Sequence, residues 1–232
     1  MLGAGGLKAK LVASQLPLPF VPDPRLTREA FIEASGNAQA VRFIDRWPRW
    51  PAPAAALHGP SGSGKSHLVA AWSKAAGGLV LAADSLAELA PAALAGRPAI
   101  AVEDIDRAPP CLGRDRVLFA LLEGASADSA VLLTGRSPPA QWPVVLPDLA
   151  SRFAALLAFP LWEPDEALLR ALAHKLFADR QLRVPEVVVD RMLLFLERSP
   201  EAIRDFVALA DGRALAEGRP VTLGLIRALL AG

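Results

Sequence analysis

Gly59-Pro60-Ser61-Gly62-Ser63-Gly64-Lys65-Ser66 is the stretch of sequence that decides the fold. It matches the pattern G-x-x-x-x-G-K-[ST], in which glycines allow backbone N–H groups to turn inward around a phosphate. The lysine of the pattern reaches β- and γ-phosphate oxygens, and the last hydroxyl can bind Mg²⁺. The alternative is a glycine-rich turn without a ligand. The residues expected to contact a nucleotide here are Ser61, Gly62, Ser63, Gly64, Lys65, Ser66 and, through its backbone N–H, His67.

The sequence on either side of this loop predicts a strand before it and a helix after it. An apolar run at 54–57 reads as a buried strand, and 65–76 reads as the helix that the loop enters. Further short apolar runs at 79–82, 99–102 and 130–133 are separated by helical or loop segments. Strands joined by crossovers of this kind predict an α/β fold with a mostly parallel sheet between helices.

The pattern changes near the two ends of the chain. Residues 1–25 contain Pro17, Pro19, Pro22 and Pro24, so we expect a flexible leader there. Two helices are expected at 27–34, capped by Thr27, and at 37–47. After Pro160, helical patterns at 163–179, 185–198, 200–217 and 222–230 follow one another. We therefore expect three parts: a leader at 1–25, a nucleotide-binding core at 26–160 and a small all-helical lid domain at 161–232.

A second acidic motif lies downstream of the loop. The segment Ala99-Ile100-Ala101-Val102-Glu103-Asp104-Ile105-Asp106 places carboxylates at the end of a predicted strand. Phosphate-binding loops are commonly complemented by such acids, which hold Mg²⁺ and orient the attacking water. We expect Glu103 at the metal position, acting through water together with Ser66, and Asp104 at the catalytic position. The alternative is that both are ordinary loop acids.

Composition excludes several classes of protein. Hydrophobic residues make up 53% of the chain, but no apolar run approaches the roughly 20 residues needed to cross a bilayer, and the N-terminus lacks a secretory pattern. A single cysteine, Cys111, rules out a disulfide framework. A net charge of +1 argues against a surface dominated by phosphate-backbone binding. We expect a cytoplasmic protein with no membrane partner and no direct sequence-specific DNA binding.

Several segments together resemble a known family. The loop at 59–66, the acidic segment 102–106, Val131-Leu132-Leu133-Thr134 with Pro138-Pro139, and Leu149-Ala150-Ser151-Arg152-Phe153 follow the order of the AAA+ ATPases of the bacterial replication initiator family, DnaA. Ser199-Pro200-Glu201-Ala202-Ile203-Arg204 resembles the lid of that family. The resemblance covers about 27–232. Because no helix-turn-helix segment follows Gly232, we expect a relative without the DNA-binding domain.

The resemblance implies roles for individual residues. Arg204 matches the arginine that touches the phosphates from the lid, and Arg152 matches the arginine finger that acts in trans on a neighbouring subunit. Phe31, Ile32 and Asn37 fall where the family packs adenine, so ADP or ATP with Mg²⁺ is the expected ligand. Each of these residues could alternatively be structural.

Two departures from the family pattern predict slow hydrolysis. Glu103 replaces the usual Asp and is one methylene longer, which displaces the carboxylate by about 1 Å. Gly135-Arg136 stands where many relatives carry a polar or acidic residue after the strand.

The leader contains a second signal, Gln15-Leu16-Pro17-Leu18-Pro19-Phe20. It resembles the short peptide by which bacterial proteins dock on the replicative sliding clamp. A proline-stiffened segment loses little entropy on binding, and its apolar side chains can fill a pocket. The residues expected to bind the clamp are Gln15, Leu16, Leu18 and Phe20. The alternative is that this peptide covers the surface of its own domain.

The leading functional hypothesis is a regulatory adaptor that docks on the clamp and supplies Arg152 to make ATP-bound DnaA hydrolyse its nucleotide. A homodimer is possible within this hypothesis. Two alternatives stay open. The first is a DnaA-like DNA-binding or loading factor, which the near-neutral charge disfavours. The second is a small-molecule P-loop kinase, for which the resemblance around Arg152 and in the lid would be a coincidence.

Overall fold

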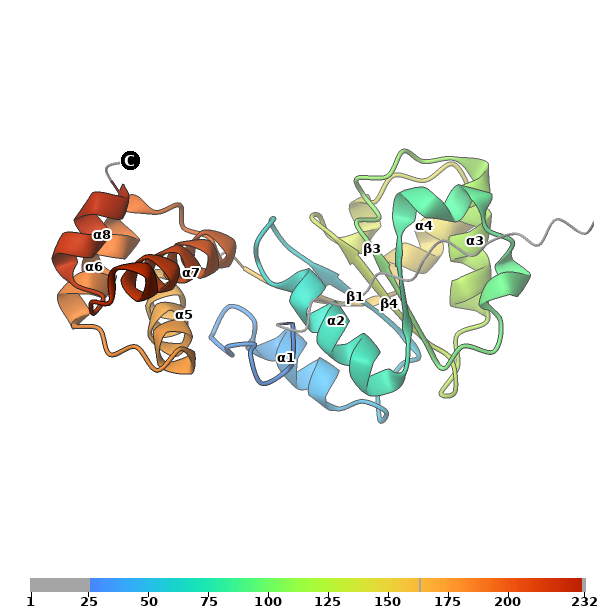
Figure 1. Ribbon diagram of the computed structural model, residues 1–232. Coiled ribbons are helices and arrows are strands. Elements are labelled where there is room, and N and C mark those ends of the chain that lie inside the picture. Colours follow the sequence, from blue (N-terminus) through green and yellow to red (C-terminus); the bar gives the residue numbers. More distant parts are fainter. Residues whose placement is uncertain (1–25, 163, 231–232) are drawn as a thin grey trace, which may run out of the picture.

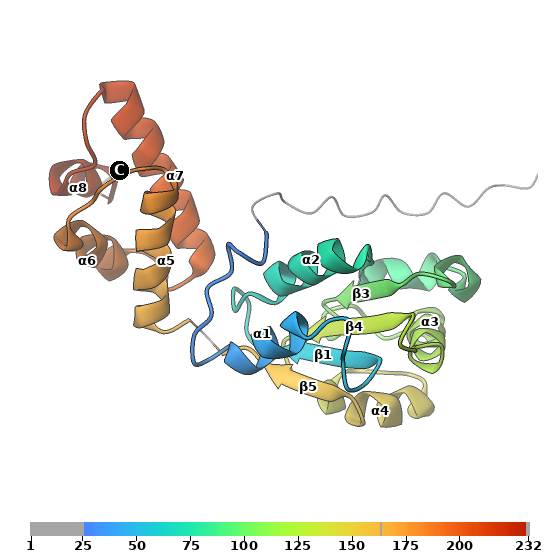
Figure 2. The same ribbon diagram turned by 90° about the horizontal axis from the view of Figure 1, so that it is seen from below.

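The computed structural model describes residues 26–162 and 164–230 and contains a parallel β-sheet flanked by helices (Figure 1). The five strands lie in the order β2-β3-β4-β1-β5. Their bounds are β1 Ala54–His58, β2 Leu79–Ala82, β3 Ala99–Glu103, β4 Ala130–Gly135 and β5 Leu157–Pro160. Figure 2 shows β3, β4, β1 and β5 side by side in this sequence. Because every pair is parallel, the carboxyl ends of all five strands meet at one edge.

Helices cover both faces of the sheet because the strand residues that point to each face are apolar. On one face α1 (Ala38–Asp45) and α2 (Lys65–Ala76) pack with Leu57 and Leu132 in one buried cluster. On the other face α3 (Leu112–Glu123) and α4 (Pro147–Ala154) pack with alternate strand residues in a second cluster. Three short 3₁₀ helices complete this part, at Ala83–Glu88, Pro91–Leu94 and Pro139–Gln141.

The C-terminal helices have a hydrophobic core of their own. These helices are α5 (Glu166–Asp179), α6 (Glu186–Phe195), α7 (Pro200–Glu217) and α8 (Leu223–Leu230). Fifteen buried apolar residues, including Phe177 and Met192, form this third cluster, and Figure 1 shows the four helices together at one end of the molecule. Side-chain caps start two of them: Asp165 Oδ1 accepts the N–H of Leu168 at 2.7 Å, and Ser199 Oγ accepts that of Ala202 at 3.1 Å. Within the described residues, no helix is long and apolar enough to cross a membrane.

The α/β fold with a parallel sheet and helical C-terminal part is confirmed, and several elements match their predicted bounds. Helix α2, strand β2 and helix α7 begin and end where the sequence predicts. Strand β5 was not predicted, because it has only four residues, ends in proline and lies at the edge of the sheet. The helix expected at 27–34 is wrong, since the segment contains a turn at 28–30 and otherwise irregular backbone. The leader and its clamp-binding peptide lie outside the described residues.

A buried ion pair joins two segments of the chain next to the carboxyl edge of the sheet. Arg114 and Asp115, adjacent on α3, are 1% and 0% exposed, and Arg114 Nη2 lies 2.7 Å from Asp115 Oδ1. The Arg114 guanidinium also donates to the carbonyl oxygens of Ile105 (3.3 Å), Ala108 (2.7 Å) and Pro143 (2.5 Å). The second Asp115 oxygen accepts the N–H groups of Val145 and Leu146 at 2.5 and 2.9 Å. The pair therefore fixes the loop after β3 against the segment that leads into α4.

We predict that Asp115→Ala destabilises the fold by about 3–5 kcal/mol, because it leaves the buried Arg114 charge without its counterion. The free energy of unfolding, measured in urea, tests this. The matched control is Asp128→Ala, in the exposed turn before β4, where a change within about 0.5 kcal/mol is expected. A loss below 1 kcal/mol for Asp115→Ala would show that the pair is dispensable.

Candidate functional site

The loop between β1 and α2 has a backbone that only glycine adopts without strain. The φ angles of Gly59, Gly62 and Gly64 are 150°, 75° and 101°. Two of these positions also lack room for a side chain. A Cβ at Gly59 would meet the carbonyl oxygen of Leu161 at 1.9 Å, and one at Gly64 would meet the Phe31 ring at 2.7 Å. The glycines predicted for a phosphate-binding loop are thus required by the geometry.

Lys65 lies at the start of α2 and curls back over the loop. It is 8% exposed, and its ammonium donates to the carbonyl oxygens of Gly59 and Pro60, both at 2.7 Å, with Ser63 Oγ at 3.4 Å. Burial lowers the pKa of the Lys65 ammonium, while the nearby Asp104 carboxylate opposes that shift. A concentrated positive charge inside a ring of backbone groups suits a phosphate.

Glu103, at the end of β3, faces the end of the same loop. Burial raises the pKa of the Glu103 carboxyl above its ordinary value, a hydrogen bond from the Ser66 hydroxyl acts against that rise, and Asp104 adds to it. Ser66 and Glu103, the two residues expected at the metal position, therefore lie near each other. No group of three or more His, Cys, Asp or Glu in the described part of the chain could hold a metal by itself. Two adjacent hard oxygen donors nevertheless suit Mg²⁺, which usually takes its other ligands from water and phosphate.

Asp104 and Asp106 shape the loop that follows Glu103. Asp104 has a left-handed backbone, with φ 58°, an uncommon conformation that Asp tolerates better than most residues. Its N–H donates to Thr134 Oγ1 on β4 at 3.2 Å, and its carboxylate pairs with Arg107 at 3.3 Å. Asp106 Oδ2 accepts the N–H groups of Arg136 and Ser137, each at 2.8 Å. The acidic loop is therefore tied to the end of β4.

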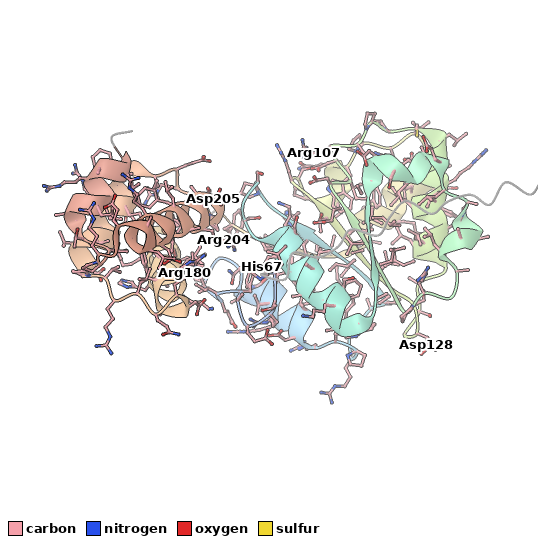
Figure 3. The ribbon with its side chains drawn as sticks, in the orientation of Figure 1. His67, Arg107, Asp128, Arg180, Arg204 and Asp205 are labelled. Atoms are coloured by element: carbon pink, nitrogen blue, oxygen red, sulfur yellow. The ribbon has the colours of Figure 1, made fainter. Side chains whose placement is uncertain are left out.

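Arg204 reaches this site from the helical part. It lies on α7 with Nη2 3.5 Å from Nδ1 of His67, and Figure 3 shows the two side chains close together between α7 and α2. His67 Nε2 lies 2.7 Å from the carbonyl oxygen of Thr27, which can only accept. We therefore assign the proton to Nε2, which leaves Nδ1 to accept from Arg204. The tip of the loop also approaches α7, since a Cβ at Gly62 would lie 3.9 Å from Ser199 Cβ.

The three residues expected around adenine lie beside the loop, in the segment before α1. Phe31 packs edge-on against the His67 ring, with ring centroids 5.1 Å apart. Ile32 packs against the helical C-terminal core. Asn37 has a local bonding role: its Oδ1 accepts the N–H of Ala34 at 2.8 Å and its Nδ2 donates to the Ile32 carbonyl at 3.1 Å. The segment thus touches both the loop helix and the helical part.

Arg152 lies away from all of these residues. It is in the last turn of α4, forms an ion pair with Glu123 at the end of α3, and sits over the Phe119 ring at 5.8 Å. It also lines a pocket of about 190 Å³ together with Pro53 and Ala54, at the amino end of β1. The loop at 59–66 follows the carboxyl end of the same strand. The structure therefore brings together the loop, Glu103, Asp104 and Arg204, but not Arg152.

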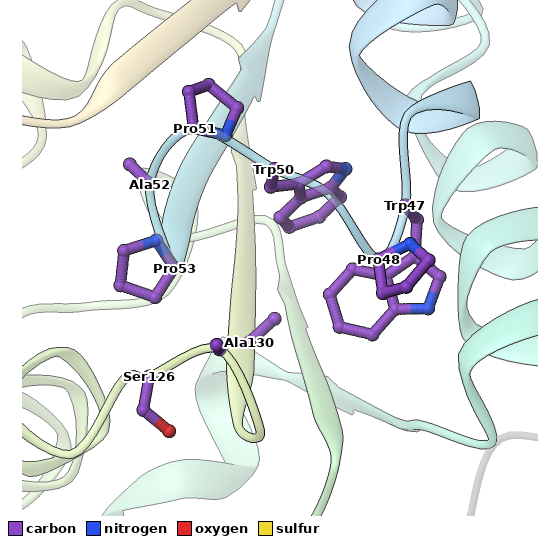
Figure 4. Close-up of a pocket in the computed structure, with 9 residues that line it drawn as sticks. Trp47, Pro48, Trp50, Pro51, Ala52, Pro53, Ser126 and Ala130 are labelled. Atoms are coloured by element: carbon purple, nitrogen blue, oxygen red, sulfur yellow. The ribbon is translucent and has the colours of Figure 1, made fainter.

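A second pocket, of about 100 Å³, also lies at the amino ends of the strands (Figure 4). Trp47, Trp50 and several prolines line it, and the Trp50 ring stacks on the buried Trp72 ring at 4.9 Å. Trp47, Trp50 and Trp72 thus belong to the core beneath α1 and α2. Neither this pocket nor the one beside Arg152 includes a residue of the loop.

Sequence reasoning missed several contacts that organise the site. Asp106 was quoted only as part of a motif, yet it anchors two backbone N–H groups. The Arg114–Asp115 pair and the partner of Arg152, Glu123, were not identified. An Arg-Asp dipeptide inside an apolar helix pattern was the available signal for the buried pair, since charges rarely occupy such positions without partners.

Comparisons with known proteins establish the fold. No family model and no curated protein matches the sequence. Among solved structures, domain III of the replication initiation protein DnaA from Thermotoga maritima is similar, with a TM-score of 0.71 and 17% identity over 90% of this chain and 96% of that one. AMPPCP-bound DnaA from Aquifex aeolicus has a TM-score of 0.70 and 19% identity, over 82% of this chain and 66% of that one. RuvB from Thermotoga maritima has a TM-score of 0.64 and 12% identity, over 87% of this chain and 70% of that one. The chain therefore has a DnaA-like AAA+ fold.

We predict that Glu103→Gln increases the free energy of unfolding at pH 8 and that this gain shrinks as the pH falls toward 5. The raised pKa means that the folded state favours the protonated carboxyl, so wild-type stability falls as the pH rises from the ordinary Glu pKa through the folded value. Glutamine keeps an oxygen that can accept from Ser66 and never ionises. Urea unfolding at both pH values measures the effect, with the exposed Glu88→Gln as control. A Glu103→Gln protein less stable than wild type at pH 8 would contradict it.

Proposed function

We propose that this chain is a regulator of replication initiation of the Hda type. In this proposal it binds ATP or ADP with Mg²⁺ at the 59–66 loop, docks on the sliding clamp, and stimulates hydrolysis of the ATP bound to DnaA through Arg152. The observation that carries the proposal is the separation of Arg152 from the chain's own phosphate-binding loop, at opposite ends of β1.

Binding of an adenine nucleotide is supported by the local geometry. Three glycines shape the loop, the Lys65 ammonium is enclosed by it, and Ser66 lies near Glu103. Arg204 approaches from α7, as a lid arginine would. The similar DnaA of Aquifex aeolicus was solved with AMPPCP, an ATP analogue. Slow hydrolysis by this chain itself is part of the proposal, because Glu103 is longer than Asp.

The position of Arg152 supports the proposed action in trans. Four residue steps separate Ala54 from His58, which corresponds to about 13 Å along the strand. The chain's own phosphates would lie beyond His58, out of reach of Arg152. Its side chain is 51% exposed, so a neighbouring molecule can approach it. Its present partner Glu123 is 45% exposed, and ion pairs of this kind contribute only about 0–1 kcal/mol. A bound triphosphate on a partner could therefore displace Glu123.

The proposed docking on the clamp rests on the leader peptide 15–20 alone. In it Leu18 and Phe20 supply apolar anchors and Gln15 supplies a hydrogen-bonding end. Each anchor is worth about 1.5–3 kcal/mol when fully buried, so the loss of both would abolish a micromolar contact. Leu16 lies within the same peptide. Contact with a DNA-loaded clamp would bring Arg152 to DnaA at the origin.

We predict that Lys65→Ala weakens ATP and ADP binding by about 1.5–3 kcal/mol, because it removes a charge-assisted contact to phosphate. Calorimetry with purified protein measures this loss. Lys74→Ala, in the last turn of the same helix, is the matched control and should bind as wild type does. Equal affinity for wild type and Lys65→Ala would refute the nucleotide site.

We predict that Arg152→Ala abolishes stimulation of DnaA-bound ATP hydrolysis while nucleotide binding by this chain is retained. Arginine fingers contribute about 10³–10⁵ to the rate, and lysine lacks the planar fork that contacts two oxygens at once. The assay follows hydrolysis by ATP-DnaA with DNA-loaded clamp present. The control is Arg116→Ala, an exposed arginine on α3.

The same assay separates the parts of the proposal. The double change Leu18→Ala and Phe20→Ala should remove the stimulation that depends on the clamp, with Arg152 intact. A wild-type rate for Arg152→Ala would reject the trans role. Loss of nucleotide binding in that variant would reject it too, because Arg152 would then serve the chain's own site.

A further inference from the structure

We propose that the leader segment 11–24 docks in the groove at the amino ends of β1 and β4, and that this contact withholds the leader from the sliding clamp. The groove is the surface around the pocket of about 100 Å³ that Trp47 and Trp50 line. Occupancy of the groove by the leader stands on its own, whereas the effect on the clamp rests on the proposed clamp docking.

The walls of the groove are apolar and rich in proline. One wall is the segment 47–53, which contains two tryptophans and three prolines, and the other is the turn at 126–130 before β4. Figure 4 shows the indoles and proline rings along the first wall, with Ser126 on the second. Aromatic-lined grooves are typical binding sites for extended, proline-rich peptides, which lose little entropy when they bind.

The size and the packing of the groove favour a peptide over other ligands. A pocket of about 100 Å³ is well below the roughly 300–1,000 Å³ of sites for small molecules, so it suits single side chains. The Trp50 ring lies nearly parallel to the rings of Phe43 and Trp72, at 4.4 and 4.9 Å. These two rings cover both faces of Trp50, so no nucleic-acid base can stack on it.

The composition of the leader matches that of the groove. Within 17–24 every second or third residue is a proline, and Leu18 and Phe20 supply large apolar side chains. Such a segment cannot form a helix and favours the extended conformation that proline-binding grooves accept. The leader therefore offers both the backbone and the side chains that the groove requires.

The charges around the groove are complementary to the same segment. Arg46 and Arg49 are exposed, and neither forms an ion pair or a side-chain hydrogen bond with any described residue. The opposite wall carries one exposed carboxylate, Asp128. Segment 11–24 has a single charged residue, Asp23. Its negative charge is opposite in sign to that of the two arginines.

The leader is long enough to reach the groove from the point where it joins the described fold. The Thr27 carbonyl oxygen lies 2.7 Å from His67 Nε2, at the start of α2. Trp72, which packs against both tryptophans of the groove, is five residues or about 7.5 Å further along α2. An extended proline-rich segment advances about 3.1 Å per residue, so residues 17–20 reach roughly 20–30 Å from Thr27. This span extends past Trp72 and into the groove.

Docking in the groove and docking on the clamp exclude each other, because both use Leu18 and Phe20. The clamp can bind only those molecules whose leader has left the groove. If the leader is docked in roughly 70–90% of molecules, the apparent affinity for the clamp falls about threefold to tenfold. The groove would thus set how readily the chain is recruited.

The indole N–H signals of the full chain, isotope-labelled for nuclear magnetic resonance, test the contact. Leu18→Ala combined with Phe20→Ala should shift the signals of Trp47 and Trp50. The signal of Trp142, which packs on the other face of the sheet, should stay in place. Unchanged Trp47 and Trp50 signals would overturn the proposal.

Three further observations make this experiment specific. Leu2→Ala combined with Leu7→Ala removes two leucines outside 11–24 and should shift no signal. The effect of the first double change should be the same at low and high protein concentration. A concentration-dependent effect would mean that the leader of a second copy fills the groove, and this would overturn docking within one chain. Shifts caused by an added oligonucleotide, with the leader changes silent, would assign the groove to nucleic acid instead.

A change in the groove itself provides the second test. Ala127→Glu brings a charged side chain into the groove from an exposed turn. In this background the double change of Leu18 and Phe20 should cause no further shift, because the leader is already displaced. This comparison separates the contact from any direct effect of the glutamate on the indoles. A second shift of equal size would show that the leader acts elsewhere and would reject the groove.

Calorimetry with the sliding clamp tests the regulatory consequence. Ala127→Glu should bind the clamp about threefold to tenfold more tightly than wild type does. The matched control is Ala216→Glu, at an exposed position on α7, which should bind as wild type does. Equal affinities for wild type and Ala127→Glu would overturn the regulatory role. If neither binds the clamp, the proposed clamp docking fails, while the indole signals still decide whether the leader occupies the groove.

Discussion

Insertion of β4 between β1 and β3 is the constraint on which the rest of the site depends. Parallel pairing brings the end of β1, with its glycine loop, and the end of β3, with its acids, to one edge, while β4 sets the spacing between them. Backbone bonds tie both neighbours to the end of β4: Gly59 N donates to the Gly135 carbonyl and Ile105 N to the Thr134 carbonyl, at 3.2 and 2.9 Å. The sheet therefore holds the loop and the acids in fixed relation before any ligand arrives.

The charged groups of the site lower the stability of the fold, as is typical of functional sites. Burial disfavours the charges of Lys65 and Glu103, and Asp104 has a left-handed backbone. A buried ion pair in the surrounding structure offsets these costs. The buried Arg114–Asp115 pair bonds to backbone groups of the loop after β3 and of the segment before α4, and removing either member would leave the other charge buried without its partner.

 The ion pair thus fixes the loop after β3, while the acidic side chains of that loop, Glu103, Asp104 and Asp106, stay partly exposed.

Local signals in the sequence predicted the fold well, and contacts between distant segments account for what it missed. The loop at 59–66 and helix α2 were predictable because glycine and lysine at fixed spacing determine the local backbone. The helix expected at 27–34 fails although Thr27 Oγ1 does accept the N–H of Ala30 at 3.3 Å. The Thr27 carbonyl is instead bonded by His67, forty residues away, and Phe31 packs over Gly64. Glu123 could not be identified as the partner of Arg152, because that pair forms only when α3 and α4 pack together.

The segment before α1 gives the molecule a mechanical property. The chain enters the described fold at Leu26, and within a few residues it is bonded to His67 through Thr27, packed on the loop through Phe31, and inserted against the helical core through Ile32. Any tension on the preceding chain, such as the pull of a tether under load, would therefore be transmitted first to the junction between the loop helix and the helical part. An anchor at the N-terminus and an occupant of the loop would act on the same few contacts.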